Sequence, residues 1–174
     1  MISFEEAYRI VMNHVTVFPS ERVNMMDSLG LILAEDILSD IDIPPFNKSA
    51  VDGFACRMDD LEDDLEVIET IPAGKIPEFT ISKGKCSRIM TGAMLPEGSD
   101  CVVMVEDTQI LDNGMMRAAK RLESLNICYQ GEDIKAGDKV LSKGILIKPQ
   151  HISVLAITGA VNPKVSKQIN VGIL

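Results

Sequence analysis

The sequence predicts an α+β fold in which β-structure predominates, and three features predict it. Across residues 44–135, short apolar runs are separated by glycine and proline, which is typical of a compact, barrel-like β domain. Helical periodicity is confined to residues 3–15 and 149–159. The 174 residues, 46% of them apolar, suffice for a sizeable core in one domain or two small ones.

The first predicted element is an amphipathic helix over residues 3–15. Ser3 and Glu6 have the spacing of a capping box, in which side chains and backbone at the start of a helix bond reciprocally. Apolar residues recur along one helical face: Phe4, Ala7, Tyr8, Val11 and Val15. Because proline cannot continue a helix, we expect this one to end before Pro19.

Residues 22–36 and 138–147 are predicted to be β-structure. In the first segment, polar and apolar residues alternate imperfectly around Ser28-Leu29-Gly30, which predicts a strand, a short helical turn and a second strand. The second segment has the pattern of a β hairpin that turns at Lys143-Gly144.

The central segment contains several short apolar runs that we expect to be strands. They are residues 67–71, 79–81, 86–90, 101–105 and 115–118. The strongest hairpin signal in the chain is Asp112-Asn113-Gly114, which lies between two apolar pairs. Antiparallel strands are therefore expected on either side of this turn.

The last predicted helix begins at Pro149 and is capped by Gly159. Proline is favoured in the first helical turn and glycine just beyond the last, and the apolar residues between them have helical spacing. Residues 164–174 then alternate between polar and apolar, which indicates a strand.

The charge of the chain excludes several classes of partner. The formal net charge is −9, and the lysines and arginines are scattered, whereas nucleic acid and anionic membranes require clustered basic residues. No apolar stretch approaches the ~20 residues of a membrane span, and the first residues lack the pattern of a signal peptide. We therefore expect a cytoplasmic protein without nucleic-acid or membrane partners.

The cysteines and histidines give little support for a zinc site or a redox dithiol. There is no Cys-x-x-Cys pair, and the two histidines are far apart in the sequence. We expect reduced and mostly buried thiols at the four cysteines: Cys56, Cys86, Cys101 and Cys128.

Two runs carry the strongest chemical signals: residues 44–55 (PPFNKSAVDGFA) and 88–100 (RIMTGAMLPEGSD). In the first, Pro-Pro forces extended backbone and Asp-Gly permits a tight turn, which holds the Asp52 carboxylate at a fixed place. In the second, a strand-like run stops at Thr91-Gly92, where a hydroxyl and successive backbone N–H groups are expected to form an anion site. Taken alone, each pattern is more often only a turn or a strand end.

Together with a third block, Gly-Glu-Asp-Ile-x-x-Gly at residues 131–137, these runs resemble the molybdopterin molybdenumtransferase family, which includes bacterial MoeA and the E domain of gephyrin. The blocks fall in the family's order, and the resemblance extends over essentially the whole chain. The sequence departs from the family pattern in three places. Phe54 replaces the usual tyrosine, Leu31 replaces an arginine, and Cys128-Tyr129-Gln130 replace basic or proline residues before the third block.

The resemblance implies a division into domains. Residues 1–20 form a helix that belongs with a large pterin-binding α/β domain missing from this sequence, and residues 166–174 form the first strand of that domain. Residues 21–43 and 136–165 form an elongated linker domain. Residues 44–135 form a β-barrel-like domain inserted into it.

The resemblance also implies the chemistry. The family inserts molybdate into adenylylated molybdopterin, releases AMP and requires Mg²⁺ or a similar divalent ion. Asp52 and Asp133 would hold the metal, because Mg²⁺ commonly takes one or two protein carboxylates together with phosphate oxygens and water. Thr91 would contact an anion and complete the catalytic group.

The substrate-binding residues implied by the same motifs are Ser49, Gly53 and Gly92. Glu106 and Lys48 are weaker candidates, since a glutamate that follows a buried run and a lysine in a loop are ordinarily just solvated. Without further domains, a chain of −9 charge is poorly built to hold molybdate and phosphates, so we expect it to be inactive alone.

The implied assembly is a two-fold homodimer in which the inserted domain closes over the pterin site of the other subunit. The adenylyltransferase of the preceding step and molybdoenzymes are further implied partners. The alternative function is a non-catalytic binding or scaffold module of the same family.

Overall fold

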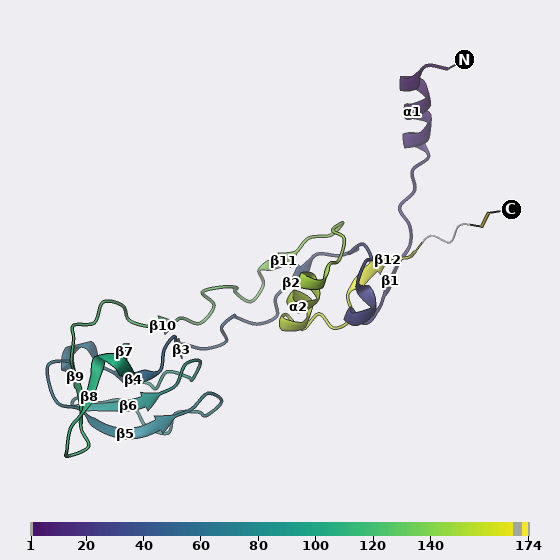
Figure 1. Ribbon diagram of the computed structural model, residues 1–174. Helices are drawn as coiled ribbons and strands as arrows, with labels where there is room; N and C mark the ends of the chain where they lie inside the picture. The colour runs from purple at the N-terminus through teal and green to yellow at the C-terminus, as the bar shows by residue number, and fades with distance from the viewer. Residues whose placement is uncertain (1, 169–171, 174) are drawn as a thin grey trace. The chain divides into compact units, whose positions relative to one another are not determined.

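The computed structural model describes residues 2–168, 172 and 173, and divides into two compact units (Figure 1). One unit comprises residues 41–136, and the other comprises the residues before and after it. The predicted strand over residues 164–174 is observed only as β12 (Lys164–Ser166), and its positions 169–171 and 174 lie outside the described residues.

Unit 41–136 is built from eight strands and two short 3-10 helices. In chain order these are β3 (Lys48–Ser49), β4 (Gly53–Cys56), η2 (Met58–Asp60), β5 (Glu66–Ile71), β6 (Lys85–Ile89), β7 (Cys101–Met104), η3 (Val105–Asp107), β8 (Thr108–Ile110), β9 (Met116–Ala118) and β10 (Ile127–Cys128). The predicted apolar runs become β5, β6, β7 and β9. The run 79–81 does not become a strand, because the Ile81 amide donates to the Glu97 carbonyl within a loop, at 2.7 Å.

The centre of this unit is a four-stranded sheet in the order β5-β6-β4-β7. Strand β4 pairs antiparallel with both β6 and β7, while β5 runs parallel to β6. All four residues of β4 are buried. Alternate side chains of a strand point to opposite faces, so β4 contributes to two clusters. Phe54 and Cys56 join one cluster, and Ala55 joins the other.

The predicted hairpin at residues 112–114 is confirmed, with β8 and β9 antiparallel on either side of it. Gly114 adopts φ +81°, the left-handed conformation that such a turn requires. A single bridge between Leu65 and Met116 joins the start of β5 to β9. Among the described residues no ladder completes the ring between β7 and β5, so the predicted barrel is an open sheet with a hairpin at its side.

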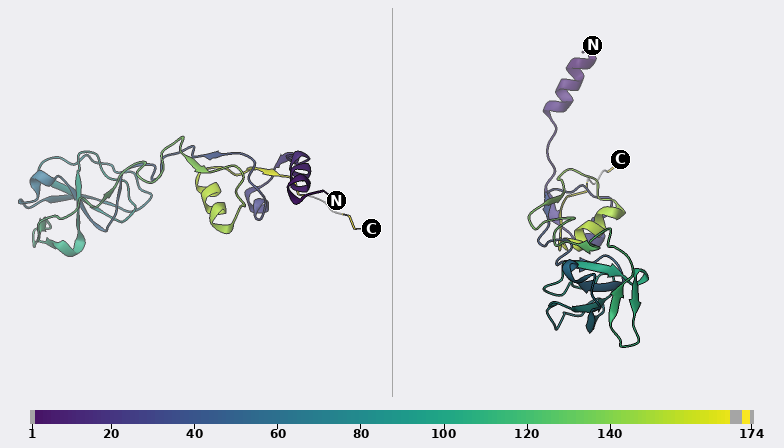
Figure 2. Two further views of the ribbon diagram at one scale, coloured as in Figure 1. Left: turned by 90° about the horizontal axis from the view of Figure 1, so that it is seen from above. Right: turned by 90° about the vertical axis from the view of Figure 1, so that its left-hand side faces the viewer.

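The other unit holds two α-helices and a set of short strand pairs. Its elements are α1 (Phe4–Asn13), β1 (Ser20–Arg22), η1 (Met25–Ser28), β2 (Ile37–Leu38), β11 (Lys139–Leu141), α2 (Pro149–Ile157) and β12. Strand β1 pairs with β12, and β2 pairs with β11, both antiparallel. Helix α2 packs against η1, as the ribbons show (Figures 1 and 2).

The predicted hairpin over residues 138–147 is wrong. A turn is present at Lys143-Gly144, but the segments on its two sides pair with residues 30–38 instead of with each other. The Leu33 amide donates to the Ile145 carbonyl at 2.9 Å, and the Gly144 amide donates to the Leu33 carbonyl at 2.8 Å. Residues 30–38 thus supply the backbone partners for both segments.

Both predicted helices are confirmed within two residues of their ends. Helix α1 is capped by Ser3, whose hydroxyl accepts a hydrogen bond from the Glu6 amide at 3.1 Å. Gly159 follows α2 with φ +72°, as expected for a glycine that ends a helix. Within the described part of the chain, no helix is long and apolar enough to cross a membrane.

Candidate functional site

Asp52 and Thr91, from separate sequence motifs, meet in unit 41–136. Asp52 immediately precedes β4, and Thr91 follows the last residue of β6 by two positions. Since β4 and β6 are antiparallel, the start of one lies beside the end of the other. One carboxylate oxygen of Asp52, Oδ1, accepts hydrogen bonds from the Thr91 amide at 2.7 Å and from the Thr91 hydroxyl at 2.6 Å.

These contacts keep the Asp52 carboxylate ionised. The hydrogen bond from the Thr91 hydroxyl lowers the pKa of Asp52, and the Thr91 amide and the positive charge of Arg88 lower it further. Both Asp52 and Thr91 are exposed. Within the described residues, no hydrogen-bond donor contacts Oδ2, the other carboxylate oxygen of Asp52. That oxygen remains available to a ligand from solution.

The backbone amides at this site are already engaged. The Thr91 amide donates to Asp52, the Gly92 amide to the Ser49 carbonyl at 2.9 Å, and the Ala93 amide to the Met90 carbonyl at 3.0 Å. The sequence led us to expect that successive N–H groups here would face an anion. In the structure they stabilise the turn itself, in which Gly92 has φ +80°.

Ser49 and Gly53 hold the segment that carries Asp52. Ser49 is buried, and its hydroxyl donates to the Val51 carbonyl at 2.5 Å. Gly53 lies so close to β7 that a Cβ there would overlap the Val103 carbonyl oxygen. Both residues therefore have a structural reason for their identity. Their predicted roles in substrate binding remain predictions.

Asp133 is held elsewhere in the same unit. Its amide donates to the Ile43 carbonyl at 3.0 Å, and its side chain is exposed. No hydrogen bond joins Asp133 to Asp52 or Thr91 in the described structure. Its backbone partner Ile43 lies at one end of segment 43–52, which contains β3, and Asp52 lies at the other end. The predicted pairing of Asp52 and Asp133 around one ion remains a prediction.

The weaker candidates lie on neighbouring elements. Glu106 is exposed in η3, and the Val105 amide next to it donates to the Asp52 carbonyl at 3.0 Å. Lys48 is half-buried in β3, opposite Cys128 of β10. As predicted, the four cysteines are free, and Cys56, Cys86 and Cys101 are buried.

The carboxylates at this site suit a Mg²⁺ ion that keeps water or phosphate oxygens as ligands better than a metal ion surrounded by protein ligands. Among the described residues, no group of three or more histidine, cysteine, aspartate and glutamate side chains gathers in space. Mg²⁺ typically takes one or two carboxylates and retains water or phosphate oxygens. An ionised, exposed Asp52 with a free oxygen meets that requirement, whereas a four-ligand zinc site is not available there.

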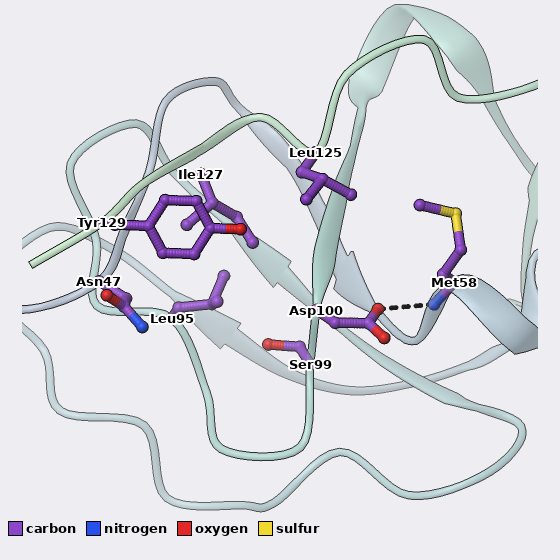
Figure 3. Close-up of a pocket in the computed structure, with 8 residues that line it drawn as sticks. All are labelled: Asn47, Met58, Leu95, Ser99, Asp100, Leu125, Ile127 and Tyr129. Atoms are coloured by element: carbon purple, nitrogen blue, oxygen red, sulfur yellow. Dashed lines mark hydrogen bonds between the residues drawn. The ribbon is translucent and has the colours of Figure 1, made fainter. Parts of the chain in front are cut away.

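A pocket of about 340 Å³ in the same unit was not predicted from the sequence (Figure 3). Its apolar wall includes Leu95, Leu125, Ile127 and Tyr129. At one side Asp100 accepts a hydrogen bond from the Met58 amide at 2.7 Å. Leu125, Ile127 and Tyr129 alternate along one segment that contains β10, and the fold brings residues 58, 95 and 100 beside them from distant parts of the chain. None of the predicted site residues lines this pocket.

Residues 2–159 match the family described as MoeA N-terminal region (domain I and II). The chain is 42% identical over 182 aligned residues to a molybdopterin molybdenumtransferase of Staphylococcus epidermidis RP62A, covering 99% of this chain and 43% of that protein. It is 38% identical over 180 aligned residues to the molybdopterin molybdenumtransferase of Staphylococcus aureus Mu50, with the same coverage of each.

Solved structures show the same similarity. The molybdopterin biosynthesis MoeA protein of Pyrococcus horikoshii OT3 superimposes with a TM-score of 0.86 at 31% identity, over 95% of this chain and 46% of that one. A second structure of the Pyrococcus protein superimposes with a TM-score of 0.86 at 33% identity, over 97% and 45% of the two chains. The present chain spans about 43% of the length of the curated relatives that it matches.

Proposed function

This chain belongs to the family of the MoeA N-terminal region, and from this we propose that it is the amino-terminal part of a molybdopterin molybdenumtransferase. The whole enzyme would insert molybdate into adenylylated molybdopterin and release AMP. One structural observation supports the proposal most directly. Asp52 and Thr91, which lie 39 residues apart in two different family motifs, are joined by two hydrogen bonds.

In this proposal the residues of the chain have distinct tasks. Asp52, kept ionised by Thr91, presents one carboxylate oxygen to Mg²⁺, and Asp133 is the second proposed carboxylate. The ion, when bound, would neutralise the charge of the phosphate and molybdate groups. Ser49, Gly53 and Gly92 are the residues proposed to bind the pterin substrate.

The compact unit 41–136 supports one part of the proposed domain organisation, the inserted domain. Residues 44–135 would be the inserted domain, and 21–43 with 136–165 the linker domain. Residues 1–20 and 166–174 would belong with a pterin-binding domain encoded outside this sequence. We further propose a cytoplasmic homodimer that exchanges intermediates with the preceding adenylyltransferase and with molybdoenzymes.

The test uses the full-length protein with adenylylated molybdopterin, molybdate and Mg²⁺, and measures AMP release. Asp52→Asn and Asp133→Asn should each lower the rate at least tenfold while the fold survives, because each replaces an exposed carboxylate with an isosteric amide. Asp112→Asn, in the exposed hairpin turn, is the matched control and should retain full activity. Unchanged rates in both variants would remove these carboxylates from the site.

A second measurement addresses the 174-residue chain itself. We expect it to release no AMP under the same conditions. Turnover by the purified chain would refute the proposal that activity requires the further domains of the enzyme. If the full-length protein also releases none, the family's scaffold function becomes the better description.

A further inference from the structure

We propose that Arg88 binds a tetrahedral oxyanion beside Asp52 and Thr91, either molybdate or the phosphoryl group of the adenylylated pterin. This inference rests on the function proposed above and adds a substrate-binding residue to it. Among the site residues predicted from the sequence, the one cation is the weaker candidate Lys48 in β3.

The register of the sheet places Arg88 next to Asp52. Phe54 of β4 is directly opposite Arg88 of β6, and Gly53 is opposite Ile89. Asp52 lies in the bend immediately before β4, two positions before Phe54 and at the end of the sheet where β6 ends just after Arg88. A long side chain such as that of arginine reaches residues about two positions away along a neighbouring strand. The effect of the Arg88 charge on the pKa of Asp52, which follows those of the two Thr91 hydrogen bonds, agrees with this placement.

The guanidinium group of Arg88 is available to a ligand. Arg88 is exposed, and no carboxylate among the described residues lies within ion-pairing distance of it. Other arginines of the chain are committed: Arg22 pairs with Glu35, Arg57 with Asp59 and Asp60, and Arg117 with Asp64. An unpaired guanidinium offers five N–H donors in a planar fork that matches two oxygens of an oxyanion.

The hydrogen-bond donors of the neighbouring turn are already used within the protein, so Arg88 is the group that can bind an anion. The Thr91 hydroxyl and amide both donate to Asp52, and the next two amides close the turn. With those donors engaged, a dianion at this site needs a cation from a side chain, and Arg88 is the cation whose charge lowers the pKa of Asp52. The oxyanion would bind between Arg88 and a divalent ion on Asp52, which explains why the two side chains lie close together without forming an ion pair.

The competing explanation is that Arg88 only neutralises Asp52. The experiment is an NMR titration of the ¹⁵N-labelled 174-residue chain with sodium molybdate and, separately, with AMP, both in the presence of Mg²⁺. Without the further domains of the enzyme the affinity should be low. We still expect saturable shifts of the amides of Ile89, Met90 and Thr91, and at least a tenfold weaker affinity in Arg88→Gln. Arg121→Gln removes the same charge from another exposed position of the unit and should leave the affinity unchanged.

The two titrations, with molybdate and with AMP, show which oxyanion Arg88 binds. Shifts with molybdate alone assign Arg88 to the metal oxyanion, and shifts with AMP alone assign it to the phosphoryl group. The proposal is overturned if neither anion gives shifts that depend on Arg88, or if Arg88→Gln and Arg121→Gln weaken binding equally.

Steady-state kinetics of the full-length protein separate this inference from the proposed function. Arg88→Gln should raise the KM for the anionic substrate identified by NMR at least tenfold and change kcat less. If the wild-type protein releases no AMP, the proposed function fails, but anion binding that requires Arg88 still stands. If AMP is released and the KM is unchanged in the variant, the function stands and Arg88 has no part in substrate binding.

Discussion

Strand β4 of unit 41–136 and helix α1 of the other unit differ in how far their apolar side chains are buried. Both faces of the sheet that contains β4 are covered, so that Phe54 is only 2% exposed. Helix α1 has an amphipathic sequence but no buried residue, and Phe4 is 78% exposed. The same residue type is thus core in β4 and surface in α1. A sequence pattern shows that a face is apolar, but it does not show what covers that face.

Two phenylalanine substitutions give the largest expected contrast between the units. Phe54→Ala removes a buried ring and should lower the free energy of unfolding of unit 41–136 by about 3–5 kcal/mol. Phe4→Ala in the same 174-residue chain should change stability by less than about 0.5 kcal/mol, because the ring is already in water. Urea unfolding followed by NMR signals from each unit measures both. Equal losses would mean that α1 is packed in solution.

A smaller loss is expected where β4 approaches β7. A Cβ at residue 53 would overlap the Val103 carbonyl, so Gly53→Ala must push the two strands apart. Forcing extra volume into a packed site costs about 1–3 kcal/mol, and the same method measures it.

Gly74→Ala is the control for this substitution. Nothing lies near a Cβ at residue 74, and only its φ of +86° opposes alanine, which costs about 1–2 kcal/mol. If Gly53→Ala costs no more than this control, the close approach of β4 and β7 does not determine the residue at position 53.

The end of α1 that is capped by Ser3 provides a third test, of local rather than global stability. Ser3→Ala removes the hydrogen bond to the Glu6 amide, and such a cap contributes about 1 kcal/mol to a helix. Helical circular dichroism at 222 nm should fall while the unfolding midpoint of unit 41–136 stays constant. A shift of that midpoint would show that α1 supports the β unit.

The features that were predicted correctly are caps and turns, which depend on residues close together in the sequence. The Ser3 cap, the glycine after α2 and the turn at residues 112–114 are all set by side chains within a few positions of one another. The prediction failed where the backbone partner is distant in sequence. Residues 138–147 have a turn of their own, but they pair with a segment more than a hundred residues earlier.

The candidate site shows the same limit. Both motifs were recognised as fixed points of the backbone, but only the second carries a glycine turn. Gly92 has φ +80°, whereas Gly53 is the first residue of β4 and does not form the predicted tight turn with Asp52. Their direct contact depends on the register of β4 and β6, which no pattern in either motif specifies. The use of the Thr91 amide by Asp52 follows from that register, as does the position of Arg88. For this reason the sequence led us to expect a backbone anion site, whereas the structure offers a side-chain cation.

The smallest expected effect concerns the acid-base behaviour of Asp52. Thr91→Val removes the hydroxyl hydrogen bond but leaves the amide hydrogen bond, so the pKa of Asp52 should rise towards its usual value without reaching it.

Because the pKa of Asp52 is lower in the folded than in the unfolded chain, the ionised form contributes stability above the unfolded-state pKa. This contribution is lost as the pH falls through the folded-state value. The stability difference between Thr91→Val and wild type should therefore be greatest near neutral pH and shrink in acid. Carboxylate titration by ¹³C NMR measures the pKa of Asp52 directly in both chains. A pKa of Asp52 that is the same in Thr91→Val as in the wild-type chain would contradict the observed contacts.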